Sequence, residues 1–380
     1  MNSAVSIEPV IDKKALRSFI EFPFTLYKKD PNWVPPFIQE RLDFFNVKKN
    51  PFYEHARYQL FLAYRNGALA GTIGAVIDDN HNRVHQEQSG AFGFFECIDD
   101  PNVAYGLFEA AEAWVREQGM TTMRGPLNFS PNQECGLLID GFDESPMVMM
   151  TYNPEYYLRL ITACGYHKKM DLFAYIGDLD ELWENAPASL FRIAENVKSR
   201  EGIRVRTLNV GRMDQENPRI QEVYNRSFSK QWGFVPMNQK ECEYFSELMT
   251  KLADPNLILI AENQAGEAVG ISLALPDFHQ ALRWCGGGRL FPFGLLKFLW
   301  HRRKIDQIRL IAMGIIEQYR NRGIDAVFWV ETARNARARG YKRLECSWVL
   351  DRNALMNSLG RTLRGKIYKT YRILEKQLSS

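Results

Sequence analysis

Short apolar runs alternate with polar turns along the chain, and they predict strands mixed with amphipathic helices. In the first half, Asn66-Gly67 is typical of a tight turn between two strands. Further along, residues 103–118 repeat apolar side chains every three or four positions, which predicts a helix that ends at Gly119. The predicted elements are strands at 58–65, 69–77, 90–97, 122–127 and 166–176, and helices at 103–118 and 154–164.

Much the same order recurs in the second half, after a helical connector at 178–200. We interpret this as an internal duplication with two domains, residues 1–190 and 191–380. Two unrelated α+β domains are the alternative. The predicted elements of the second half are strands at 204–208, 257–262, 268–275, 308–316, 343–350 and 367–374, and helices at 217–228, 240–252, 326–339 and 354–363.

The composition is that of a soluble globular protein, with 46% hydrophobic and 24% charged residues. The sequence contains no run of 18 apolar residues, so it predicts no membrane-spanning helix. The six cysteines form no CxxC pair and have no histidine at a spacing typical of metal ligands, so we expect no metal. The first residues do not resemble a secretion signal, and we expect a cytoplasmic protein with reduced thiols.

Positive charge is concentrated in the last quarter of the chain. Residues 283–376 carry 21 Lys and Arg against 7 Asp and Glu, although the net charge of the whole chain is only +3. We therefore expect an acidic partner for this region: a cofactor phosphate, a lipid surface or a nucleic acid.

The stretch from Gln318 to Ala326 has the features of an anion cradle, because it joins a predicted strand to a predicted helix. The free amides and the dipole of a helix N-terminus attract phosphate. Gly323 lets the backbone come close, and Arg320 and Arg322 can add charge-assisted hydrogen bonds. The sequence therefore predicts a site for a phosphorylated cofactor.

This turn resembles the R/Q-x-x-G-x-G/A loop of the GNAT superfamily of N-acyltransferases, with Asp325 in place of the last Gly or Ala. The resemblance implies an α+β fold of two tandem GNAT-like domains, each a central, mostly antiparallel sheet flanked by helices. It implies that the N–H of Ile315 receives the oxyanion, and that Gly360 replaces the family's usual acid, a Tyr. It also implies that acyl-CoA binds at the loop, through Gln318, Arg320, Asn321, Arg322, Gly323, Ile324, Asp325 and Asn353.

The corresponding turn of the first half, Cys97 to Val103, contains Asp99 and Asp100 and neither Arg nor Gly. Two carboxylates would repel a phosphate. We therefore expect the first half to be a degenerate copy that helps to shape the substrate site without binding the cofactor.

Residues 283–306 form an apolar and basic insertion in the second half. Between Arg289 and Lys304, Leu, Phe and Trp300 stand beside basic residues, which suits an interfacial helix on an anionic membrane; a core helix is the alternative. With this insertion the chain is similar to the bacterial ceramide synthase group. That similarity implies long-chain acyl transfer to a sphingoid base by a protein peripheral on the cytoplasmic face of the inner membrane. Its other supporting stretches are Asn153–Tyr157, Leu275–Asp277 and Leu344–Leu350.

Acyl transfer to an amine needs a base, because an alkylammonium titrates near about 10 and does not attack as such. Glu345 is the first candidate, since Glu is uncommon in strands. Asp277 and His279 are the second, and Glu96 is the third. Tyr368 is a candidate acid for the leaving thiolate. For each of them an ordinary surface, hydrogen-bonded or packing role is the alternative.

Two other functions stay open. An aminoacyl-tRNA-dependent transferase of the peptidoglycan-bridge type also pairs two GNAT-like halves, although Arg320 and Gly323 favour CoA over tRNA. A non-catalytic acyl-CoA or lipid-binding module would be compatible with Gly360. We expect no DNA partner.

Overall fold

The computed structural model describes residues 4–200, 202–285, 287–289 and 292–378. The chain forms two compact units that do not follow its two halves. The first unit comprises residues 1–172, 282–299 and 369–380, and the second comprises 173–281 and 300–368. Compact units need not coincide with the copies of a duplicated sequence. The predicted domain boundary at residue 190 therefore stays a prediction.

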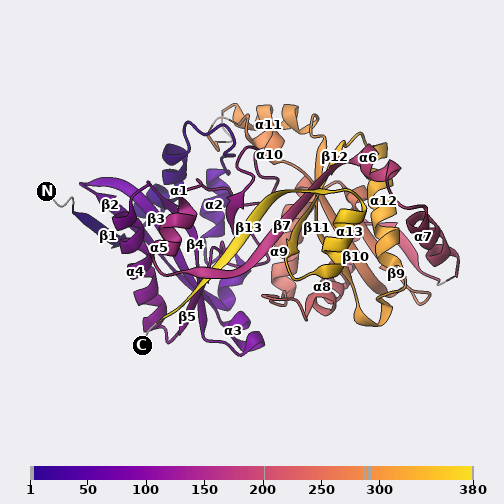
Figure 1. Cartoon of the computed structure of the whole chain (residues 1–380), viewed down its shortest axis with the longest axis horizontal. Helices are drawn as coiled ribbons and strands as arrows, with labels where there is room; N and C mark the ends of the chain where they lie inside the picture. The colour runs from indigo at the N-terminus through magenta and orange to yellow at the C-terminus, as the bar shows by residue number, and fades with distance from the viewer. Residues whose placement is uncertain (1–3, 201, 286, 290–291, 379–380) are drawn as a thin grey trace. The chain divides into compact units, whose positions relative to one another are not determined.

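The first unit is a sheet with helices packed on it (Figure 1). Strands β4 and β5 run parallel, whereas the pairs β1–β2, β2–β3, β3–β4 and β5–β13 are antiparallel. The sheet order is β1 (Val5–Pro9), β2 (Ala56–Arg65), β3 (Ala68–Asp78), β4 (Ser89–Cys97), β5 (Thr122–Gly125) and β13 (Lys366–Gln377), and β6 (Leu137–Asp140) also pairs with β13. Its helices are α1 (Lys13–Leu26), α2 (Ile38–Phe44), α3 (Asp79–His85), α4 (Pro101–Glu117) and α5 (Tyr157–Ala163).

The second unit repeats this plan. Its sheet order is β12 (Arg343–Leu350), β11 (Gln307–Ile315), β10 (Ala268–Pro276), β9 (Ile258–Glu262) and β8 (Arg204–Thr207). Strands β11 and β12 run parallel. Its helices are α6 (Leu179–Glu184), α7 (Ala188–Arg200), α8 (Met213–Phe228), α9 (Gln239–Leu252), α10 (His279–Leu282), α12 (Ile324–Ala338) and α13 (Ala354–Thr362). Strands β7 (His167–Asp178) and β13 and helix α11 (Gly294–Arg302) contribute residues to both units, as does α10 through its last residue, Leu282.

Both units share one irregularity, which supports the duplication. In the first unit β4 carries a bulge opposite β3, between the pairs Thr72–Glu96 and Gly74–Gly93. In the second, β11 carries a bulge opposite β10, between the pairs Leu273–Ala312 and Ala274–Leu310. In each unit the bulged strand pairs in parallel with its other neighbour over only three or four residues. The predicted fold class, two tandem domains each with a mostly antiparallel sheet, is confirmed.

The predicted order of strands and helices holds, with local differences that have simple causes. Strand β5 ends at Gly125 rather than at residue 127, because Pro126 has no N–H for a sheet. The connector is two helices, α6 and α7, separated at Pro187. Two strands were missed: β1 and the four-residue β6.

Candidate functional site

The turn before α12 leaves a helix N-terminus without a side-chain cap. Gly323 is the N-cap residue, with φ of 83°, and as a glycine it has no side chain that could cap α12. A Cβ on Gly323 would lie 2.4 Å from Cγ2 of Ile193, so any other residue would have to displace that side chain and adopt a strained positive φ. Asn321 also has positive φ, at 60°. This geometry suits an anionic group on the helix N-terminus.

Arg320 holds this turn in place. Its Nε donates to the carbonyl of Ile315 at 3.1 Å, and its Nη2 donates to the carbonyl of Ser227 at 2.6 Å. The loop is thereby tied to the end of β11 and to α8. The Arg322 guanidinium lies over the ring of Tyr319, 4.9 Å from its centroid.

The remaining residues of the predicted cofactor set are dispersed around this turn. Gln318 accepts from Arg226 at 3.4 Å, and Ile324 is buried under the helix. Asp325 is exposed in the first turn and does not cap it. Asn353 is instead the N-cap of α13, where its side chain accepts from the N–H of Met356 at 3.2 Å.

Gly360 is explained by packing. A Cβ at this position would lie 2.8 Å from the ring of Tyr175. The Tyr175 hydroxyl in turn donates to Asn357 at 2.9 Å. A tyrosine side chain at residue 360 therefore has no room in this arrangement.

Two predicted catalytic residues, Glu345 and Tyr368, meet in the interior of the second unit. The Tyr368 hydroxyl donates to Oε2 of Glu345, and Ser347 Oγ donates to Oε1 at 2.5 Å. Arg309, the β11 partner of Glu345 in the sheet register, places its Nε 3.3 Å from Oε1 and donates to Ser347 at 2.8 Å. Glu345 is 0% exposed and Arg309 2%. This is a buried ion pair inside a hydrogen-bonded network.

Cys346, the neighbour of Glu345, is not a reactive thiol. Burial, and then the charge of Glu345, raises the pKa of Cys346 to about 12. A nucleophilic cysteine needs a lowered pKa instead.

Glu96, the third candidate base, has different surroundings in the first unit. The hydroxyls of Tyr27 and Tyr157 both donate to its Oε2, at 2.6 and 2.8 Å. Burial raises the pKa of this carboxyl to about 7, against the lowering effect of these two hydrogen bonds and of the charge of Arg41. Its carboxyl therefore changes charge near neutral pH.

Asp277 and His279 lie at the far end of their strands from the predicted cofactor turn. Strands β10 and β11 pair from Gly270–Ile315, at the end beside the cofactor turn, to Pro276–Ile308, at the end next to Asp277. Six residues of strand span about 20 Å. Asp277 is buried and accepts from the N–H of His279 at 3.3 Å, at the start of α10. This position does not favour either residue as the base.

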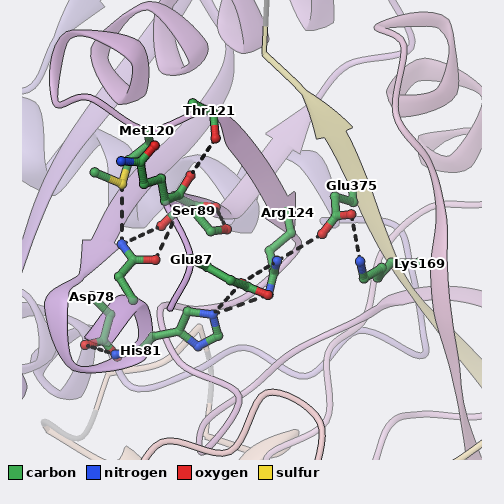
Figure 2. Close-up of polar contacts among 12 residues, drawn as sticks. Asp78, His81, Glu87, Ser89, Met120, Thr121, Arg124, Lys169 and Glu375 are labelled. Atoms are coloured by element: carbon green, nitrogen blue, oxygen red, sulfur yellow. Dashed lines mark hydrogen bonds and ion pairs between the residues drawn. The ribbon is translucent and has the colours of Figure 1, made fainter. Parts of the chain in front are cut away.

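A second buried polar network in the first unit secures the C-terminal strand (Figure 2). Arg124 of β5 contacts Glu375 of β13 at 3.0 Å and Glu87 at 2.7 Å, and Lys169 contacts Glu375 at 2.8 Å. His81 lies 3.2 Å from Glu87. Burial, then the charge of Arg124, lowers the pKa of His81. A small open pocket adjoins the network, lined by Val76, Asp78, His81, Ser89, Gly90, Ala91, Arg124, Leu127, Phe129 and Pro131.

Helix α11 and the residues before it expose large apolar side chains beside basic ones. Phe298 is buried, where its ring packs on Phe37 at 5.9 Å. The exposed fractions of Phe293 and Trp300 are 67% and 63%. The exposed apolar surface consists of Trp284, Phe293, Leu295, Leu296, Leu299 and Trp300. Residues 286, 290 and 291 of this insertion lie outside the described part of the chain.

No helix in the described ranges is long and apolar enough to cross a membrane. Within the same ranges, no group of three or more His, Cys, Asp or Glu side chains is placed to hold a metal ion.

No family profile matches the chain. Two curated proteins match it over nearly its whole length. The bacterial ceramide synthase of Caulobacter vibrioides is 37% identical, covering 99% of this chain and 98% of its own length. The chain belongs to the bacterial ceramide synthase family. Protein YghO of Escherichia coli is also similar to the chain, at 35% identity, covering 98% of this chain and 95% of its own length.

Comparison with solved structures shows that the chain has the GNAT fold. A tandem GNAT protein from the clavulanic acid biosynthesis pathway superposes with a TM-score of 0.59, at 10% identity and 99% coverage of both chains. A GCN5-related N-acetyltransferase from Sphaerobacter thermophilus gives 0.52, at 14% identity, covering 99% of this chain and 96% of its own. Family and fold together support an acyltransferase.

Several residues of these networks escaped the sequence-based prediction. Arg309 carried a usable signal, because an arginine inside an apolar strand needs a buried partner. Tyr27 and Tyr157 carried none, because they are 130 residues apart in the sequence and become neighbours only in the folded unit.

Proposed function

We propose that the chain transfers a long-chain acyl group from acyl-CoA to the primary amine of a lipid-like acceptor, a sphingoid base, to form a ceramide-type amide. The observation that carries this proposal is the uncapped N-terminus of α12 behind Gly323. It lies in a chain that belongs to the ceramide synthase family over its whole length.

The donor half of the proposal rests on the second unit. The first-turn amides of α12 would bind the pyrophosphate of CoA, with Arg320 holding the turn and Arg322 beside it. The Ile315 N–H remains our candidate for the oxyanion, since Ile315 lies at the end of the bulged strand. Asn353 is the less favoured member of this set, because its side chain already caps α13.

The first unit has no equivalent cradle. Its fourth strand is followed by Asp99 and Asp100, and Asp100 caps α4 by accepting from the N–H of Asn102 at 2.9 Å. In addition, the Asn128 side chain accepts from the N–H of Phe94, the bulge residue of β4, at 2.8 Å. The chain thus covers this stretch of strand itself, which supports a single donor site in the second unit.

In the reaction, the amine nitrogen bonds to the thioester carbon, the carbon–sulfur bond breaks, and the thiolate leaves. The ammonium form must first give a proton to a base. Glu96, whose pKa is about 7, is chemically suited to accept a proton near neutral pH, whereas the Glu345 carboxylate is buried and paired with Arg309. Tyr368 donates to Glu345, which favours a structural role for its hydroxyl.

The proposal includes docking on an anionic membrane, on the cytoplasmic side, where a lipid amine is available. Helix α11 exposes Leu296 and Trp300, and Phe293 is exposed just before it. The sequence from 278 to 305 contains six Lys and Arg and no Asp or Glu. Lys304 lies over the Trp300 ring, 5.7 Å from its centroid. Apolar side chains beside basic ones suit the boundary between acyl chains and anionic headgroups.

The donor site is tested with Gly323→Asp. We expect palmitoyl-CoA affinity to fall at least tenfold, because a side chain would collide with Ile193 and displace the turn, and its negative charge would repel the pyrophosphate. Gly340→Asp is the matched control, since Gly340 also has φ of 83°, lies just past the other end of α12 and has open space around it. Arg320→Glu should reproduce the loss. Equal affinity in both glycine variants would refute the donor site.

Activity is tested by release of CoA thiol from palmitoyl-CoA with sphinganine, with an amino acid amide as the control amine. The proposal is supported if sphinganine causes thiol release from palmitoyl-CoA and the amino acid amide does not. CoA binding without thiol release for any amine would favour the non-catalytic module, and binding of tRNA instead of CoA would favour the aminoacyl transferase.

Membrane docking is tested by sedimentation with phosphatidylglycerol liposomes. Phe293→Ser with Trp300→Ser should release the protein, whereas Val47→Ser with Tyr105→Ser, also at exposed apolar positions, should leave it bound. No binding by the unaltered protein would end this part of the proposal.

A further inference from the structure

The carboxyl of Glu96 is bonded on one oxygen only. The hydroxyls of Tyr27 and Tyr157 both donate to Oε2. Among the described residues, Oε1 has no hydrogen-bond donor, and Glu96 makes no salt bridge. The side chain is half-buried rather than sealed. A fixed carboxylate therefore keeps one oxygen available for a further donor.

Further aromatic rings pack against the two tyrosines that bond this carboxyl. The ring of Tyr27 stacks on Trp33 with centroids 5.1 Å apart, and Tyr152 meets Tyr27 at 6.0 Å. From α5, the ring of Tyr157 lies 5.2 Å from that of Tyr156. The side chains of Trp33, Tyr152 and Tyr156 are only partly buried, so their rings stay accessible. Aromatic faces attract cations, and most strongly so when water is excluded.

The other polar groups near Glu96 are already occupied. Nη2 of Arg41 donates to both carboxylate oxygens of Glu134, at 2.7 and 2.8 Å, and the guanidinium lies over the ring of Phe94. Tyr156 donates to the carbonyl of Cys97 at 2.7 Å, and the N–H of Cys97 donates to Tyr157 at 2.7 Å. With Glu96 ionised, Glu96, Glu134 and Arg41 together leave one negative charge uncompensated.

We propose that Glu96 and the aromatic side chains of Tyr27, Trp33, Tyr152, Tyr156 and Tyr157 bind the ammonium group of the amine acceptor. A primary alkylammonium supplies what this site lacks, since it is a cation with N–H donors for Oε1 and a charge for the ring faces. The inference rests on the proposed acyl transfer for its biological meaning, but the binding site lies wholly in the first unit.

The site should bind best between two titrations. The groups that face Glu96 are Tyr27, Arg41, Cys97, Tyr156 and Tyr157, and burial raises the pKa of Tyr156, Tyr157, Tyr27 and the Cys97 thiol above their ordinary values. Arg41 stays charged. Amine affinity should therefore rise as Glu96 loses its proton near pH 7, and fall again as the amine itself becomes neutral, near about pH 10.

The test is calorimetric binding of decylamine to the full chain without any acyl donor, with N-acetyldecylamine and decanol as uncharged probes. We expect binding of decylamine only, and at least a tenfold loss in Glu96→Gln. Glu109→Gln, the same change at an exposed position of α4, should bind like the unaltered chain. Equal binding of decanol, or unchanged affinity in Glu96→Gln, would overturn the site.

Tyr27→Phe gives a second measurement if Glu96→Gln fails to fold. Its hydrogen bond lowers the pKa of Glu96, so removing the hydroxyl should move the lower pH midpoint of amine binding upward. An unmoved midpoint would contradict the site. Because no donor is present, Glu96-dependent binding without transferase activity would leave the site standing and remove the proposed reaction. Donor-dependent thiol release that is unchanged in Glu96→Gln would support the proposed reaction and remove the ammonium site.

Discussion

Each unit holds a glutamate bonded to tyrosine, and the two glutamates differ in burial and in what balances their charge. Glu345 faces Arg309 at 3.3 Å, accepts from Ser347 and Tyr368, and is fully buried. Glu96 is half-buried and bonded to two tyrosine hydroxyls, and its pKa is about 7.

The difference suggests that Glu345 is a structural carboxylate, whereas the carboxylate of Glu96 is available to exchange a proton or bind a cation. A buried ion pair fixes its own protonation and geometry, and it is damaged when either member is lost. A carboxyl without a paired cation titrates where the solution pH can reach it. We therefore propose proton transfer and cation binding for Glu96 and a structural role for Glu345.

The largest expected effect is on Arg309. Arg309→Leu would leave Glu345 buried without its cation, and we expect it to lower the free energy of unfolding by about 3–5 kcal/mol. Urea denaturation measures this. The double variant Arg309→Leu with Glu345→Leu should recover most of the loss. A change below about 1 kcal/mol in the single variant would break the comparison.

The next effect is a slope of stability with pH caused by Glu96. The pKa of Glu96 is raised in the folded protein, so its contribution to stability is fully present below the unfolded-state value. It is lost as pH rises through about 7. Between pH 5 and 8 we expect this contribution to fall by on the order of 1–3 kcal/mol. Denaturation curves at several pH values should show a shallower slope in Glu96→Gln than in Glu109→Gln. Identical slopes would place the carboxyl in an ordinary environment.

The smallest effect concerns the thiol beside Glu345. With the pKa of Cys346 raised to about 12, the thiolate needed for an acyl-enzyme is scarce at neutral pH. Cys346→Ala should therefore keep the rate of thiol release within about threefold. A loss greater than about a hundredfold would show that the second unit supplies a nucleophile, and the assignment of its glutamate to rigidity would have to be withdrawn.

The sequence by itself determined the duplicated strand and helix order and the turn around Gly323. These features depend on local physics: hydrophobic period, turn chemistry, and a glycine where the backbone takes positive φ. It also brought Glu96, Glu345 and Tyr368 forward as candidates, but it ranked Glu345 first because a Glu within a strand is unusual.

Only the tertiary structure could reverse that ranking. Whether a carboxyl is paired with an arginine or with two tyrosines depends on residues that are distant in the sequence, such as Arg309 for Glu345 and Tyr27 for Glu96. Burial and nearby charge set a pKa, and both are properties of the packed chain. The same reasoning explains Gly360, whose missing side chain reflects the ring of Tyr175, and Asn353, which the fold uses to cap a helix. Local sequence fixes how each segment bends, whereas long-range packing decides which side chains share an environment.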